Sequence, residues 1–338
     1  MQGCQSRRAF VQGAGAVGLA LVAGCGLLPS HAQRPARVAR LGILSSGSAN
    51  TASPSARDEA FREGLRDLGY VEGQNLVLES RYADTELERL PDLAAELVRL
   101  PVDLLVTSGD PATQAAKRAS ATLPIVFANL SAPVENGIVA SLARPGGNAT
   151  GLIDIGPELS GKRLQLLRDA LPGLARVGVL WSPQLAGPAL QFQETERAAR
   201  ALGLDLLPFP LHGAEEIDAA FEAARRGRAE ALVVLPSPIT ITPARRIVEQ
   251  AARNRLPAMY GHPANMAAGG LMSYGPSFAD NWRRAATYVD KVLKGVKPAD
   301  LPVERPMRFD FIINLQTAQA LGLSIPPHVL AQATEVLQ

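Results

Sequence analysis

The strongest constraint on the fold is a regular alternation of short apolar runs with stretches of helical periodicity. The first four apolar runs cover residues 38–44, 75–82, 102–108 and 124–130. Between them, apolar residues recur at the three- and four-residue spacing of a single helix face. Continuous apolar strands that alternate with helices indicate a parallel sheet with helices on both of its faces. We therefore predict an α/β fold.

The same order of elements occurs twice along the chain. ARLGILSS (39–46) corresponds to ARVGVLWS (175–182), and LPIVFANL (123–130) corresponds to LPAMYGHP (256–263), each about 130 residues further on. Any two α/β domains share some of this alternation, but the common order and spacing favour a duplication. The sequence thus predicts two similar, doubly wound parallel-sheet lobes with hinge crossovers and a cleft between them.

The lobe boundaries follow from the turn-rich segments. The segment 145–150 is rich in turn residues and is expected to belong to the first crossover. A second crossover at Pro276-Ser277 would return the helix 278–294 to the first lobe. We predict an export signal at 1–32, a first lobe at 36–152 plus 277–300, and a second lobe at 153–276 plus 303–338.

The first 32 residues contain a string that matches a nucleotide-binding fingerprint. Residues 13–18 read G-A-G-A-V-G, but no strand precedes them and no acidic residue occurs before Asp58. The fingerprint requires a preceding strand and an acidic residue about 20 positions further on. The basic pair Arg7-Arg8 followed by the mostly apolar stretch 9–24 is instead typical of an export signal, and it resembles the twin-arginine motif.

Two processing sites are open at the end of this leader. Cys25 closes a string that resembles a lipoprotein box, whereas Ser30-His-Ala32 resembles a peptidase site with cleavage before Gln33. A transmembrane anchor is disfavoured because spanning a bilayer requires about 20 apolar residues. We expect a periplasmic protein that is either free or lipid-anchored through Cys25.

Composition excludes several other classes of function. Without Arg7 and Arg8, basic and acidic residues number 32 each, so the basic excess of a nucleic-acid-binding protein is absent. Both cysteines, Cys4 and Cys25, lie in the leader, so the body of the chain has neither a disulfide nor a cysteine-ligated metal. The four histidines show no metal-ligand spacing. We expect no metal, no cofactor, no nucleic acid and no membrane span.

The candidate site lies at the carboxyl ends of the predicted strands, where open parallel sheets bind ligands. These strand ends are rich in hydroxyl groups and glycine, which can form hydrogen bonds and approach a ligand closely. They provide Ser45, Ser46, Thr107, Ser108, Gly109, Asn129, Leu130, Ser131, Ser182, Ser237, His262 and Tyr274. His262 is the one histidine at a strand end, and it has no recognisable catalytic partner.

Several strings resemble those of a known family of binding proteins. They are FREGLRDLGYVEGQNLVLESRYA (61–83), TSGDPATQAA (107–116), NGIVASLARPGGNATG (136–151) and KGVKPADLPVE (294–304). On these strings the chain resembles the ABC transporter substrate-binding family that includes tryptophan/tyrosine-type proteins. The resemblance implies a type I periplasmic binding fold that closes on a ligand between its lobes and delivers it to an inner-membrane permease powered by an ATPase.

The resemblance also implies a pocket at matching positions. It supports most of the strand-end residues above and adds Asp154, which is the one acid we expect at a pocket position. The sequence departs from the family at three positions. Relatives often have a different residue where this chain has Ala132, and amino-acid-binding relatives tend to carry an acid near Pro238 and His262. A ligand ammonium group needs a carboxylate or several carbonyls. We therefore expect a small, partly apolar organic acid or an amino-acid-like solute.

Two further hypotheses remain open at this point. The chain could be a periplasmic sensor that hands its ligand to a receptor, or a secreted α/β enzyme that uses His262 or Asp154. We expect a binding protein without catalytic residues, and we expect it to be a monomer.

Overall fold

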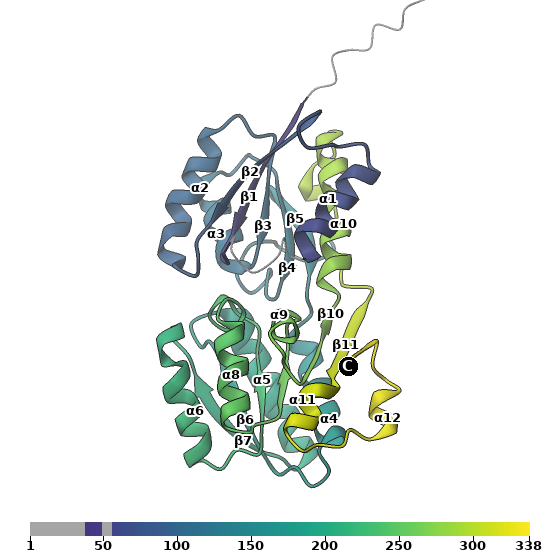
Figure 1. Ribbon diagram of the computed structural model, residues 1–338. Helices are drawn as coiled ribbons and strands as arrows, with labels where there is room; N and C mark the ends of the chain where they lie inside the picture. The colour runs from purple at the N-terminus through teal and green to yellow at the C-terminus, as the bar shows by residue number, and fades with distance from the viewer. Residues whose placement is uncertain (1–37, 49–55) are drawn as a thin grey trace, which may run out of the picture. The chain divides into compact units, whose positions relative to one another are not determined.

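The computed structural model describes residues 38–48 and 56–338, and within them the chain forms two separate sheets (Figure 1). The first sheet is wholly parallel, in the order β2-β1-β3-β4-β5. Its strands are β1 (Ala39–Ser45), β2 (Leu76–Tyr82), β3 (Leu104–Ser108), β4 (Ile125–Leu130) and β5 (Ala149–Ile153). β1 to β4 coincide with the four predicted apolar runs to within about two residues, and the α/β fold class is confirmed. β5 was not predicted, because it lies where a crossover was expected.

The second sheet has the order β12-β11-β10-β9-β8-β6-β7. Its strands are β6 (Arg176–Trp181), β7 (Asp205–Pro210), β8 (Ala231–Val234), β9 (Ala258–Tyr260), β10 (Met272–Pro276), β11 (Phe309–Asn314) and β12 (Glu335–Leu337). All neighbouring strands are parallel except β10 and β11. Between these two strands the chain leaves for the first sheet and comes back, so β11 enters the second sheet from the opposite end.

Helices cover both faces of the first sheet (Figure 1). Helices α2 (Leu90–Arg99) and α3 (Asp110–Ala119) pack on one face, and α1 (Ala56–Asp67) and α10 (Phe278–Leu293) pack on the other. Two apolar clusters result, one on each face, and β4 between them is buried at every residue. We call this sheet with its four helices the first lobe.

The second sheet is enclosed in the same way and forms the second lobe with its helices. Helices α4 (Ser160–Ala170) and α5 (Ala186–Leu202) cover one face, and α6 (Ile217–Arg226) and α8 (Ala244–Arg253) cover the other. The remaining helices are α7 (Pro238–Ile241), α9 (Ala264–Ala267), α11 (Leu315–Ala320) and α12 (Pro327–Leu330), with 3-10 turns at Leu87–Arg89, Pro157–Leu159, Ala214–Glu216 and Pro298–Asp300.

Within the described residues, three connecting segments join the lobes. Asp154–Gly156 leads from β5 toward α4, Ser277 joins β10 to α10, and residues 301–308 lead back to β11. Glu304 in the third segment forms a bridge with Leu152 of β5. The segments thus run close to the first sheet, and each connects the carboxyl-end side of a strand or helix to the other lobe.

Candidate functional site

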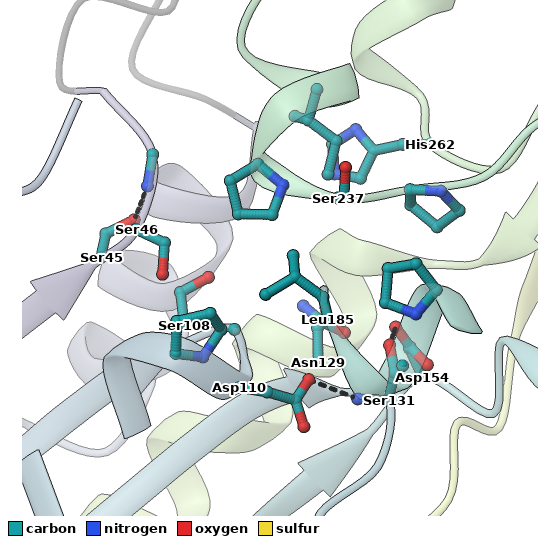
Figure 2. A pocket seen from close by; sticks show the side chains of 18 of the residues that line it. Ser45, Ser46, Ser108, Asp110, Asn129, Ser131, Asp154, Leu185, Ser237 and His262 are labelled. Carbon is teal, nitrogen blue, oxygen red and sulfur yellow. Dashed lines mark hydrogen bonds between the residues drawn. The ribbon is translucent and has the colours of Figure 1, made fainter. Parts of the chain in front are cut away.

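A cavity of about 240 Å³ lies at the carboxyl ends of strands from both sheets (Figure 2). This volume is at the small end of ligand pockets, which range from about 300 to 1,000 Å³. Nine of the predicted site residues line it: Ser45, Ser46, Ser108, Gly109, Asn129, Ser131, Asp154, Ser237 and His262. The strand ends of the two sheets therefore converge on one site that suits a small molecule.

The other four predicted residues do not line the cavity. Thr107 is buried with its Oγ1 2.7 Å from Thr113 Oγ1, and Leu130 packs in the core of the first lobe. Tyr274 packs against Phe309 and Phe311. Ser182 supports the site indirectly.

Ser182 and Thr240 hold the lining residue Ser237 in place. Ser182 Oγ lies 2.9 Å from Ser237 Oγ, and the Ser237 backbone N–H donates to Thr240 Oγ1 at 2.9 Å. Ser237 also accepts from the Thr240 backbone in a capping box at the start of α7. The Thr240 hydroxyl in turn donates to the Leu235 carbonyl. These buried hydroxyls are satisfied within the protein and fix the end of β8.

One side of the cavity is an acidic corner formed by Asp110, Ser131 and Asp154 (Figure 2). The Ser131 backbone N–H donates to Asp110 Oδ2 at 3.1 Å, and Ser131 Oγ donates to Asp154 Oδ2 at 2.7 Å. The expectation of a single pocket acid was wrong, because Asp110 lines the cavity as well. Its place directly after the strand-end pair Ser108-Gly109 was the signal that could have identified it.

Burial raises the pKa values of both carboxyl groups in the acidic corner. Desolvation raises the pKa of Asp110, and hydrogen bonds from Ser131, Asn136 and Ala132 oppose this effect. Desolvation raises the pKa of Asp154 to about 6, against hydrogen bonds from Ser131 and Gly156. Those two bonds use two of the roughly four acceptor positions of the Asp154 carboxylate. The corner therefore retains acceptor capacity for a donor or cation in the cavity.

Three other lining residues, which we call the donor group, carry buried polar atoms with no hydrogen-bond partner among the described residues. These atoms are Ser46 Oγ, Asn129 Nδ2 and Trp282 Nε1. A buried donor without a partner costs about 1–3 kcal/mol. Ser46 lies across the cavity from Asp154 in Figure 2, with Asn129 between them. The residues that line the cavity thus include unpaired buried donors in addition to the acidic corner.

Asn129 is held in an uncommon backbone conformation at the end of β4. Its φ is 56°, in the left-handed region, and the β4–β5 register shifts between Phe127 and Leu130. Asn tolerates this conformation better than most residues, and strained residues often occur at ligand sites. Asn281 Nδ2 of α10 donates to Asn129 Oδ1 at 2.7 Å. The carboxamide is thereby oriented, and its Nδ2 donor remains unused.

His262 and Arg57 form a further side of the cavity. His262 Nδ1 accepts from the Ala264 backbone N–H at 3.1 Å, which places the hydrogen of the neutral ring on Nε2. Burial, with a contribution from Arg57, lowers the pKa of His262 to about 3. Arg57 lies over the Trp282 ring at 5.8 Å. His262 is therefore a neutral ring here, and Arg57 supplies the positive charge.

Sequence reasoning missed Arg57 because it lies in the first turn of a helix and not at a strand end. Most of the apolar lining was also missed, since its residues lie on loops and helices. It consists of Leu185, Ala186, Pro188, Pro236, Pro238, Ile241 and Phe278. The Phe278 ring meets His262 edge to face at 4.3 Å. An apolar group of a ligand would contact this lining.

The start of α5 packs closely against the acidic corner. A side chain at Gly187 would place its Cβ 2.5 Å from Ser131 Cβ, so only glycine fits. Ala186 and Gly187 line the cavity at the N-terminus of this 17-residue helix. Unpaired N–H groups and the helix dipole favour an anion at such a position.

Neither a metal centre nor a membrane-spanning helix is present in the part of the chain that the structure describes. No three His, Cys, Asp or Glu side chains there gather as a metal site. No helix in residues 56–338 is both long and apolar enough to cross a bilayer.

Comparisons with known proteins agree with the two-sheet fold and the cavity described above. A curated Tyrosine-binding protein of Clostridioides difficile (strain R20291) is 25% identical over 266 residues, covering 78% of this chain and 76% of that protein. A crystal structure of a conserved domain protein from Vibrio cholerae O1 biovar El Tor strain N16961 is 25% identical with a TM-score of 0.83, covering 89% of this chain and 100% of that one. A structure of an ABC domain in complex with L-Trp from Streptococcus pneumonia is 26% identical with a TM-score of 0.82, covering 88% and 99%.

The match to a protein family extends over most of the chain. Residues 50–337 match the family described as ABC transporter substrate binding protein. The two-sheet fold and the cavity at the strand ends agree with this match and with the expected resemblance. The chain belongs to the ABC transporter substrate-binding protein family.

Proposed function

We propose that this protein is the solute-binding component of an ABC importer and that it captures an amino acid in the cavity. The observation that carries the proposal is the presence of the acidic corner and the unpaired donor group in one small cavity. An α-amino acid carries an ammonium and a carboxylate on adjacent groups, so it complements both. The tyrosine-binding relative and the L-Trp complex support this ligand class.

The lining residues divide into three roles. Asp154 and Asp110 are assigned to the ligand ammonium, because charge-assisted hydrogen bonds are the strong ones. Ser46, Asn129 and the Arg57 guanidinium are assigned to the carboxylate. The apolar lining is assigned to the ligand side chain. A second carboxylate in the corner removes the reason for preferring an organic acid without an amine.

The cellular setting of the proposal follows from the leader and the family. Export through residues 1–32 would place the protein in the periplasm, where it delivers its ligand to a permease with its ATPase. Lipid attachment at Cys25 and cleavage after Ala32 stay alternative predictions. Intact-mass spectrometry of the secreted protein separates them, because lipidation adds a large mass to a chain that starts at Cys25.

Isothermal titration calorimetry with a matched series of ligands tests the proposal. L-tryptophan is compared with tryptamine, which lacks the carboxylate, and with indole-3-propionate, which lacks the ammonium; L-tyrosine and L-leucine probe the side chain. We expect each truncated compound to bind about 10- to 100-fold more weakly than its parent, because a charged group then loses its partner.

Variants identify the residues responsible. Asp154→Asn and Asp110→Asn should weaken the binding of L-tryptophan more than the binding of indole-3-propionate. Asp92→Asn, at an exposed position of α2, is the control and should change neither affinity. Indole-3-propionate binding as tightly as L-tryptophan would overturn the assignment of an amino acid. If none of the three amino acids binds, the proposed ligand class is overturned.

A further inference from the structure

Arg163 of α4 is a buried charged residue outside the cavity lining. Its side chain is completely inaccessible to solvent. Within the described residues no carboxylate lies in ion-pair distance of it, although the charge of Asp154 acts on it. Burial lowers the pKa of Arg163 to about 10. A buried guanidinium without a direct counter-ion is costly, so hydrogen bonds must hold it.

Those hydrogen bonds reach one segment that connects the lobes and the strand that leads into another. Arg163 Nε donates to the Tyr274 carbonyl at 2.8 Å, and Nη1 donates to the Gly156 carbonyl at 3.4 Å. Tyr274 belongs to β10, which runs into α10, and Gly156 closes the segment after β5. One guanidinium therefore joins the 154–156 connecting segment to β10, the strand that leads into a second connecting segment.

Glycines make room for this contact. A Cβ at Gly261 would lie 3.3 Å from Arg163 Cζ, and a Cβ at Gly275 would lie 3.0 Å from the Gly261 carbonyl. A Cβ at Gly156 would lie 2.5 Å from Gln191 Nε2. Gln191 Oε1 accepts from Arg163 Nη1 at 3.0 Å. The guanidinium thus lies in a cradle of three glycines and one buried amide.

The cradle is directly linked to the cavity through Asp154. The Gly156 backbone N–H donates to Asp154 Oδ1 at 2.8 Å, so the residue that donates to the cavity carboxylate also accepts from Arg163. Between them, Ile155 has a φ of 46°. Left-handed backbone is a genuine outlier for a β-branched residue and costs about 1–3 kcal/mol.

The cradle is also incompletely satisfied. Arg163 Nη2 and Gln191 Nε2 are both buried without a hydrogen-bond partner among the described residues. Strain at Ile155 and two unused donors therefore occur together at the segment that follows Asp154.

We propose that Arg163 is a positioning residue that clamps the 154–156 segment to β10 and couples the state of Asp154 to the angle between the lobes. Ligand binding at Asp154 displaces the 154–156 segment, and the Arg163 guanidinium transmits this displacement to β10 and α10. Hinge closure requires a few residues that absorb a backbone change, and Ile155 is placed to do so. The coupling to ligand rests on the proposed function, but the clamp itself does not.

Double electron–electron resonance on the ligand-free protein tests the clamp. Spin labels are placed at the exposed positions Glu88 and Glu222, one in each lobe, after Cys4 and Cys25 are changed to serine. R163K keeps the charge but loses the planar set of donors, so it should broaden the interlobe distance distribution. Q191E supplies a carboxylate to the guanidinium and removes an unused donor, so it should narrow the distribution.

Arg168 provides the matched control. It lies on the same helix and donates only to the Leu202 carbonyl, at 3.5 Å. R168K should leave the distribution unchanged. Circular dichroism identifies the variants that remain folded. If R163K does not fold, the distance distribution of Q191E alone tests whether Arg163 acts as a clamp. A wild-type distribution in Q191E, or in folded R163K, overturns the proposal.

A ligand titration then separates the clamp from the proposed function. The affinity of R163K for L-tryptophan should fall by about tenfold, within the usual range of coupling between sites. If L-tryptophan binds neither protein, the proposed function fails while the ligand-free distances still decide the clamp. If both proteins bind it equally, coupling through Arg163 is excluded.

Discussion

At the scale of single residues, buried polar groups divide into those that the protein satisfies and those that it leaves open. Thr240 and Ser182 are satisfied by their neighbours around Ser237. Ser46 and Asn129 keep buried atoms that have no partner in residues 38–48 and 56–338. The sequence could indicate hydroxyl-rich strand ends, but not which hydroxyls face the cavity, because that depends on contacts between segments far apart in the chain.

Asp154 should make ligand binding depend on pH. Its pKa is raised to about 6 by burial, with the charge of Asp110 raising it and that of Arg163 lowering it. The carboxylate attracts a ligand ammonium only when charged, so affinity should be nearly full from about pH 7 upward and about half of that at pH 6. It should fall by up to about tenfold per pH unit below that value. Calorimetry with L-tryptophan between pH 5 and 8 measures this, and D154N should bind weakly with a flat profile.

The same group should affect stability with the opposite sign. The pKa of Asp154 is near 3.8 in the unfolded chain and about 6 in the folded protein. Between these values the folded state holds the proton more tightly, so this contribution to stability is lost as pH rises. The wild-type minus D154N difference in the free energy of unfolding should therefore decrease from pH 4 to pH 7. A constant difference would show that burial does not shift this pKa.

At the scale of elements, the period of the apolar residues was enough to predict most strands. β1, β3 and β4 coincide with largely apolar runs because a strand covered on both faces needs apolar residues at most positions, whereas the edge strand β2 is only partly buried. The antiparallel direction of β11 could not be predicted, since local pattern does not tell from which end a chain enters a sheet. β12 has two exposed residues out of three, so it lacked the apolar signal.

The pairing of β4 with β5 should depend on one glycine. Gly151 has a φ of 150°, and a Cβ there would lie 1.9 Å from the Phe127 carbonyl oxygen. Backbone cannot move aside as a flexible side chain can, so G151A should lower the free energy of unfolding by about 3 kcal/mol or more. Urea denaturation measures the change.

Gly147 is the matched control for this substitution. A Cβ at Gly147 meets nothing within 4 Å, although the residue lies only four positions from Gly151. G147A should change the free energy of unfolding by less than about 0.5 kcal/mol. Equal stability of the two variants would contradict the steric argument.

At the scale of the whole molecule, two lobes contribute to one site, so a bound ligand should stabilise them together. L-tryptophan at 100 times its dissociation constant should raise the free energy of unfolding by about 2.7 kcal/mol, if it binds only the folded state. The urea midpoint should rise while the slope of the transition stays the same. D154N at the same ligand concentration should show a smaller rise. An unchanged midpoint in the wild type would contradict binding in the cavity between the lobes.

The cavity lining lies on strand ends, loops and helix starts, while the apolar clusters lie along the strands and helix faces behind them. This separation has a consequence for evolution. A substitution at Pro238 or His262 should change which ligand the cavity accepts while the four apolar clusters stay intact. Ligand preference can therefore diverge quickly among descendants of one ancestral scaffold, through a few changes at a time, while the architecture is inherited unaltered.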